Sequence, residues 1–203
     1  MISDMFDSIE GLPGLRRIYQ QIDREARTFV EKTALKCPEC CGQCCYTSSS
    51  NIEVTILEMM LPALELWRKG EALAIIDRLT KIFPDSHCIF FSPQEDPGNG
   101  SGRCSIYPNR ALICRLFGIS GNLDKYKKIR FSPCLWMQKE MPDQEMRLRR
   151  MLKSGLVIPV FSTYRYRVLS LNPLLASELY PINTALALAL QRVGYYRQYK
   201  GTA

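Results

Sequence analysis

Residues 37–45 read Cys-Pro-Glu-Cys-Cys-Gly-Gln-Cys-Cys, so five of the nine cysteines in this 203-residue chain fall within nine positions. Positions 37 and 40 are three residues apart, and so are positions 41 and 44. Two cysteines at this spacing can hold one metal ion from a single turn, because the backbone between them folds back around the ion. Gly42 relieves the tight turn within the second pair. The stretch therefore predicts an irregular, metal-organised loop.

Cysteine use elsewhere in the chain argues against a disulfide framework. Nine cysteines are about 4% of the residues, whereas short disulfide scaffolds carry roughly 8–10%. The N-terminus, MISDMFDSIEG, has no basic segment followed by an apolar one, so no secretory signal is expected. The longest purely apolar run near either end, residues 185–190, is far shorter than the roughly 20 residues that a bilayer requires. We therefore expect a cytoplasmic protein, not associated with a membrane, whose clustered thiols are metal ligands or redox groups.

Apolar residues at helical spacing flank the cluster on both sides. They predict a helix over residues 12–36 with one buried face. The first cysteine follows directly after this helix. After the cluster, Thr55 followed by Glu58 forms the pattern of a capping box, in which each side chain bonds the backbone amide of the other residue. A second helix is expected from there to about Lys69, where Gly70 ends it.

The rest of the chain extends this helical pattern. Further helices are expected over three segments, namely residues 71–83, 137–153 and 182–199. Residues 88–91 read as a short strand or buried turn, and residues 92–103 as an exposed loop rich in proline and glycine. The predicted fold is mainly α with little β, its helices packed around an irregular, cysteine-rich core. We expect one domain over residues 1–203, with a cysteine-cluster region at 37–134 and a basic helical part at 137–203.

Four more cysteines follow the cluster, at positions 88, 104, 114 and 134. Each of them taken singly could be a small buried hydrophobic residue, as free cysteine often is. Four such residues within 47 positions, downstream of a cysteine cluster, favour metal ligation instead. Thiolate ligands suit zinc, iron and iron–sulfur clusters alike, so the residues leave the metal and the number of metal ions open.

The cysteine motifs also occur in a specific order. In sequence, they are Cys41-Gly42-Gln43-Cys44-Cys45, Cys88-Ile89-Phe90-Phe91, Cys104-Ser105-Ile106-Tyr107 and, after Arg110, Cys114-Arg115-Leu116-Phe117. This order resembles that of the YkgJ-like cysteine-cluster proteins, which are zinc- or iron-chelating proteins with a CxxCxxCC signature. The resemblance spans residues 37–134. It implies a metal site of eight cysteines: Cys37, Cys41, Cys44, Cys45, Cys88, Cys104, Cys114 and Cys134.

The chain departs from the family pattern at two places. The first family cysteine is expected three residues before the Cys-Gly-x-Cys-Cys element, where this chain has Pro38. Cys37 could supply this ligand with a one-residue insertion, and Cys40 is the alternative. The family also tends to have proline after the arginine that precedes its Cys-Arg motif, whereas Arg110 is followed here by Ala111.

Three functions are compatible with these patterns. The first is a metal-binding protein in which the cysteines hold zinc, iron or an iron–sulfur cluster. The second is an iron–sulfur enzyme, because the flagellin lysine-N-methylases are similar through the same cysteine pattern; the chain, however, has no glycine-rich nucleotide motif and only one histidine. The third is a zinc-stapled adaptor. Residues 101–203 carry 17 basic and 5 acidic side chains, against 10 and 15 in residues 1–100, so the second half could bind nucleic acid or an acidic protein.

Three other side chains near the motifs could take part in the site. His87 precedes Cys88 and could bind zinc, although a lone loop histidine is usually solvent-facing. Arg110 and Arg115 could hold an anionic substrate. A simpler interpretation is that their positive charge stabilises deprotonated thiols nearby.

Overall fold

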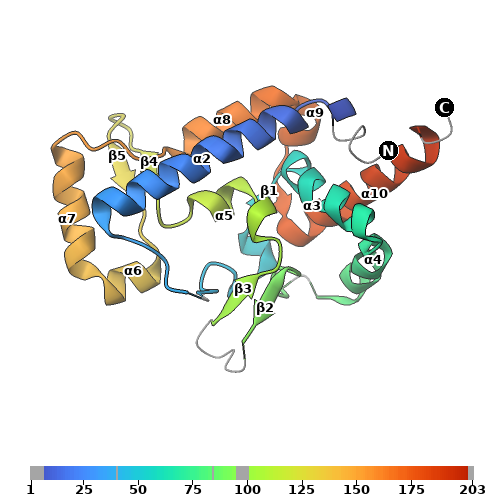
Figure 1. The fold of residues 1–203 in the computed structure, drawn as a ribbon, viewed down its shortest axis with the longest axis horizontal. Helices are drawn as coiled ribbons and strands as arrows, with labels where there is room; N and C mark the ends of the chain where they lie inside the picture. Colours follow the sequence, from blue (N-terminus) through green and yellow to red (C-terminus); the bar gives the residue numbers. More distant parts are fainter. Residues whose placement is uncertain (1–6, 40, 84, 95–100, 201–203) are drawn as a thin grey trace.

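The computed structural model describes residues 7–39, 41–83, 85–94 and 101–200, and its helices lie along the top and at both ends of the molecule in the view of Figure 1. The helices are α2 (Leu12–Thr33), α3 (Ile56–Lys69), α4 (Ala72–Lys81), α5 (Leu112–Leu116), α6 (Leu135–Glu140), α7 (Pro142–Lys153), α8 (Phe161–Leu171), α9 (Pro173–Ala176) and α10 (Ile182–Lys200). The strands are β1 (Glu53–Val54), β2 (Phe91–Pro93), β3 (Gly102–Cys104), β4 (Gly121–Leu123), β5 (Ile129–Phe131) and β6 (Tyr180–Pro181). The prediction of a mainly α fold with little β is confirmed, since the described strands form only two-stranded antiparallel pairs.

Helix α2 forms where the apolar spacing predicts it and ends shortly before the first cysteine. Its buried face includes Leu15, Ile18 and Ile22. Ala34 adopts a left-handed conformation, with φ of 60°, and its amide bonds the carbonyl of Val30. This turn closes the helix three residues before the predicted end, because the chain must change direction to enter the cysteine loop.

The capping box that begins α3 is present. The Glu58 amide donates to Thr55 Oγ1 at 3.2 Å, and the Thr55 amide donates to Glu58 Oε2 at 2.9 Å. Gly70 ends the helix with φ of 77°, a conformation that glycine adopts without strain. Helix α3 is buried along most of its length and packs mainly against α10. At this contact Trp67 Nε1 donates to the carbonyl of Leu190 at 3.0 Å.

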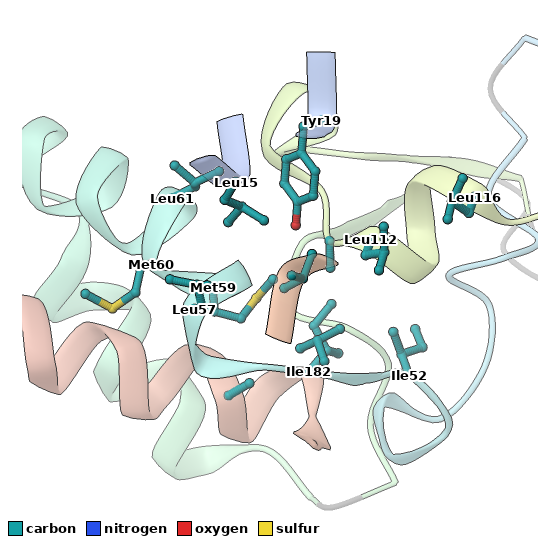
Figure 2. Packing of buried hydrophobic residues seen from close by; sticks show 14 of the residues in the cluster. Leu15, Tyr19, Ile52, Leu57, Met59, Met60, Leu61, Leu112, Leu116 and Ile182 are labelled. Atoms are coloured by element: carbon teal, nitrogen blue, oxygen red, sulfur yellow. The ribbon is translucent and has the colours of Figure 1, made fainter. Parts of the chain in front are cut away.

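The hydrophobic core lies where α2, α3, α5 and α10 meet. Figure 2 shows Leu15 and Tyr19 of α2 facing Met59 of α3, with Leu112 of α5 and Ile182 of α10 beside them. In Figure 1, α2 runs along α8, α6 and α7 lie at one end of the molecule, and α4 and α10 lie at the other. The hairpin of β2 and β3 lies beside the loop that follows α2, at the bottom of the view (Figure 1).

Two predicted segments differ from the structure. Residues 92–103 are not simply a loop, because Ser92 pairs with Arg103 and Pro93 with Gly102 in a β2–β3 hairpin; residues 95–100 lie outside the described part. Residues 137–153 do not form a single helix. The chain breaks between α6 and α7, at Met141, since Pro142 cannot continue the preceding helix.

The helix predicted over 71–83 corresponds to α4, and Pro84 lies outside the described residues. Residues 88–91 form a turn that leads into β2. Helix α8 was not predicted. Its apolar side chains do not form one clear stripe, and only Tyr164 and Val168 are buried.

Glu58 also joins two helices. Besides capping α3, its Oε1 accepts a hydrogen bond at 2.7 Å from the amide of Leu112, the first residue of α5. Only 2% of Glu58 is exposed. A glutamine in its place could turn its NH₂ group toward a backbone N–H, and two buried hydrogen-bond donors would then face each other. We expect Glu58→Gln to lower the free energy of unfolding by about 2 kcal/mol in urea titrations. Glu53→Gln, at an exposed glutamate, is the control, and equal stabilities would contradict the assigned role.

Candidate metal centre

The predicted ligands are carried by five separate parts of the fold. Positions 37, 41, 44 and 45 lie in the loop after α2. Cys88 lies in the turn before β2, and Cys104 is the last residue of β3. Cys114 is in the middle of α5, and Cys134 is the N-cap of α6. The remaining cysteine, Cys40, lies outside the described residues.

Seven of these cysteines line one cavity of about 420 Å³: Cys37, Cys41, Cys44, Cys45, Cys88, Cys104 and Cys114. Apolar side chains, including Ile52, Phe90 and Ile182, form much of the remaining wall. Glu39 and Tyr107 also line the cavity and are exposed, so this side is open to solvent. The fold thus gathers thiols from segments that are up to 77 positions apart in the sequence.

Cys134 lies beside this cavity rather than among its lining residues. Its side chain is buried, and its Sγ accepts a hydrogen bond from the Met137 amide at 3.4 Å. It is nevertheless an electrostatic neighbour of Cys37 and Cys41. Cys134 is therefore close enough to the loop after α2 to belong to the same group of thiols.

The donor set fits a thiophilic metal. All eight described cysteines are free thiols, and the Sγ atoms of Cys44 and Cys45 are 3.9 Å apart. Soft sulfur ligands in this number suit zinc, iron or an iron–sulfur cluster. As placed, no three Cys, His, Asp or Glu side chains of the described residues meet closely enough to hold one ion. The thiols surround the cavity, and they would have to draw inward around a metal.

Protonation differs sharply among these thiols. Desolvation raises the pKa of Cys37 to about 11, although the residue as a whole is exposed, and burial raises the pKa of Cys88 to about 12. The hydrogen bond with Cys45 lowers the pKa of Cys44 to about 7, with help from the positive charge of Arg110. Near neutral pH, Cys44 is therefore the thiol most readily deprotonated. Because a metal binds thiolates, its binding must release protons, and affinity should rise with pH.

Arg110 and Arg115 have different environments. Arg110 lines the cavity, stacks on the Tyr107 ring at 4.0 Å and lowers the pKa of Cys44 by its charge. Arg115 is buried instead against α2, where Nη1 donates to both carboxylate oxygens of Asp23 at 2.7 and 2.9 Å. Its Nε donates to the Arg110 carbonyl at 3.0 Å and its Nη2 to the Pro108 carbonyl. Arg110 thus supplies charge to the thiols, whereas Arg115 fixes the backbone that carries Arg110.

His87 does not line the cysteine cavity. Its residue is exposed, and its Nδ1 lies 2.8 Å from the Thr47 carbonyl oxygen. Its ring packs against Tyr46 and Phe91, with centroid distances of 4.9 and 5.8 Å. These contacts agree with the expectation of a solvent-facing histidine.

A protein-family model matches the region of the chain that carries the cysteines. The model described as "CxxCxxCC: Putative zinc- or iron-chelating domain" matches residues 36–140, just over half of the chain and all eight predicted ligands. The chain belongs to the CxxCxxCC family. No curated protein and no solved structure matches the chain.

Membership of the CxxCxxCC family agrees with the sequence-based resemblance, and the family description indicates zinc or iron chelation by residues 36–140. None of the described helices is both long and apolar enough to cross a membrane. Sequence reasoning missed two members of the site region. Glu58 was recognised only as a helix cap, and Asp23 was not singled out, because its partner Arg115 lies 92 positions away.

Proposed function

We propose that this protein binds zinc or iron through eight cysteine thiolates: Cys37, Cys41, Cys44, Cys45, Cys88, Cys104, Cys114 and Cys134. The observation that carries the proposal is the meeting of seven of these thiols around one cavity from four separate segments of chain. The family description of a zinc- or iron-chelating domain supports it. Eight thiolates would be enough for two zinc ions or for an iron–sulfur cluster, since four thiolates suffice for each.

Metal analysis and an absorption spectrum of protein purified without oxygen would identify the metal. A brown protein bleached by dithionite would contain an iron–sulfur cluster, and a colourless protein with bound zinc would not. The absence of any metal from well-folded, reduced protein would overturn the proposal. The alternatives of a methylase-like enzyme and of an adaptor for nucleic acid or an acidic protein stay predictions.

Cys44→Ser tests whether these thiols are ligands. Four-ligand zinc sites in small domains bind with about 10–16 kcal/mol, so one thiolate accounts for roughly 3 kcal/mol, or about a hundredfold in affinity. We expect zinc binding to weaken by about that factor in a chelator competition, and the midpoint of thermal unfolding to fall.

Cys40→Ser is the matched control, because it removes a neighbouring thiol that our assignment leaves outside the site. It should bind zinc as the unmodified protein does. Full metal content in Cys44→Ser would contradict the role of Cys44, and loss of metal in Cys40→Ser would show that Cys40 takes the place of Cys37.

A further inference from the structure

The eight thiols are held in two different ways. One group, the inner set, consists of Cys45, Cys88, Cys104 and Cys114. The other, the outer set, consists of Cys37, Cys41, Cys44 and Cys134. Three members of the inner set lie on or beside β2, β3 and α5, whereas three members of the outer set lie in the irregular loop after α2.

The segments of the inner set are tied to the helical core. The amide of Leu112, two residues before Cys114, bonds the buried Glu58 carboxylate at 2.7 Å. The amide of Ile89, next to Cys88, bonds Asn183 Oδ1 of α10 at 2.9 Å. Beside Cys104, the Ser105 amide bonds the Phe90 carbonyl at 2.9 Å. The first two bonds tie the segments of Cys114 and Cys88 to α3 and α10, and the third ties the segment of Cys104 to the turn that carries Cys88.

In the loop of the outer set, the backbone contacts of Cys41 run within the loop and to Ser101, which precedes β3. The amide of Cys41 bonds the carbonyl of Pro38 at 3.3 Å, and Cys41 forms an isolated bridge with Ser101. Cys37 is exposed, as is its neighbour Glu39 at the cavity wall. Segments with exposed backbone and few buried contacts open locally at low free-energy cost. Cys37 and Cys41, which lie on this loop and are not buried, should therefore leave a metal more readily than Cys104 on β3 or Cys114 on α5.

Electrostatic interactions among the thiols agree with this division. The cysteines whose charge raises the pKa of Cys37 are Cys41, Cys134 and Cys44. Those whose charge raises the pKa of Cys114 are Cys88, Cys44 and Cys104. Cys44 adjoins both sets, and it completes four ligands for the outer set. Four thiolates on each side match the tetrahedral coordination of zinc.

We propose that the centre has two metal sites, an inner one that retains its ion and an outer one whose ion exchanges readily with solvent. The proposal rests on the proposed function of the same cysteines. A retained ion organises the fold around the cavity. The exchangeable ion in the outer site would be available to a chelating partner. A protein that transfers zinc to another protein requires such an ion.

The test uses the full chain loaded with zinc and the coloured chelator 4-(2-pyridylazo)resorcinol in excess. We expect two zinc ions per chain, released in two phases of equal amplitude, with rates that differ by at least about tenfold, equivalent to a ~1.4 kcal/mol difference in activation barrier. Two ions released in one phase would overturn the unequal sites. A single bound ion would overturn the second site but leave the proposed function intact. No zinc at all would overturn the two zinc sites, and metal analysis of protein purified without oxygen would then decide the proposed function separately.

Two variants assign the two release phases to the two sites, and each variant replaces a thiol of intermediate exposure. Cys41→Ser should lose the fast phase and keep the slow one, and Cys104→Ser should do the reverse. Loss of the same phase in both variants would contradict the division.

If a variant does not fold, a labelling experiment on the unmodified protein still tests the division. After a brief exposure to the chelator, alkylation by N-ethylmaleimide followed by peptide mass spectrometry should label Cys37 and Cys41 before Cys88 and Cys104, and the opposite order would refute the assignment.

Discussion

Removal of bound metal by a chelator under reducing conditions is expected to lower the midpoint of thermal unfolding by roughly 10 °C. A ligand present at a thousand times its dissociation constant adds about 4 kcal/mol of stability, and for a chain of this size each kcal/mol shifts the midpoint by about 2–4 °C. The loss should be local at first. The loop after α2 has few apolar anchors and depends on the metal for its order, whereas α3 and α10 share a hydrophobic core.

Circular dichroism and calorimetry of metal-loaded and metal-free protein would measure the shift, and amide hydrogen exchange would locate it. We expect faster exchange over residues 37–45 and little change in α3. Zinc added back to the reduced protein should restore the midpoint, which separates metal loss from irreversible damage. An unchanged midpoint after complete metal removal would contradict the view that the metal organises this region.

Arg115→Gln is expected to lower the free energy of unfolding by about 2–3 kcal/mol, because it removes hydrogen bonds made by a buried, charged guanidinium, whereas the Asp23 side chain, 42% exposed, regains contact with water. Only 4% of Arg115 is exposed, and it bonds Asp23 and two loop carbonyls while stacking on the Tyr19 ring at 4.2 Å. A glutamine side chain has a single NH₂ group and cannot replace the several N–H donors of the guanidinium. Because one of the carbonyls belongs to Arg110, zinc affinity should also fall.

Arg130→Gln is the matched control for this variant. Arg130 pairs with Asp124 at 3.0 Å, but 70% of its side chain is exposed, and exposed pairs contribute about 0–1 kcal/mol. Urea unfolding of both metal-loaded variants gives the comparison. Similar losses in the two proteins would mean that burial does not distinguish the pairs, and the structural role given to Arg115 would be wrong.

The parts of the fold that the sequence predicts are those with local signals. Helix α3 is marked by Thr55 and Glu58, which are three positions apart and bond each other, and by Gly70 at its end. The β2–β3 hairpin was missed because its ends pair across a segment whose proline and glycine content suggests a loop throughout. Helix α8 was missed since its packing against α2 involves few buried side chains and gives no periodic stripe.

The same distinction applies to the site. The chemistry of cysteine and the order of its motifs predict which residues could bind metal, because ligand type is a property of each residue. The arrangement around them depends on contacts between distant positions. Neither the bond from Leu112 to Glu58 nor the pair of Arg115 with Asp23 has a local sequence pattern, because each joins positions that are far apart in the chain.

The double role of Glu58 extends the metal centre beyond its sulfur atoms. One carboxylate fixes the start of α3 and the start of α5, and α3 in turn packs closely on α10, where a methyl group at Gly194 would come within 2.9 Å of Trp67. A substitution in that contact is expected to shift α3, and with it the Glu58 carboxylate that bonds α5 two residues before Cys114. Changes in the helical core can therefore be expected to alter the affinity of the cysteine region for zinc or iron.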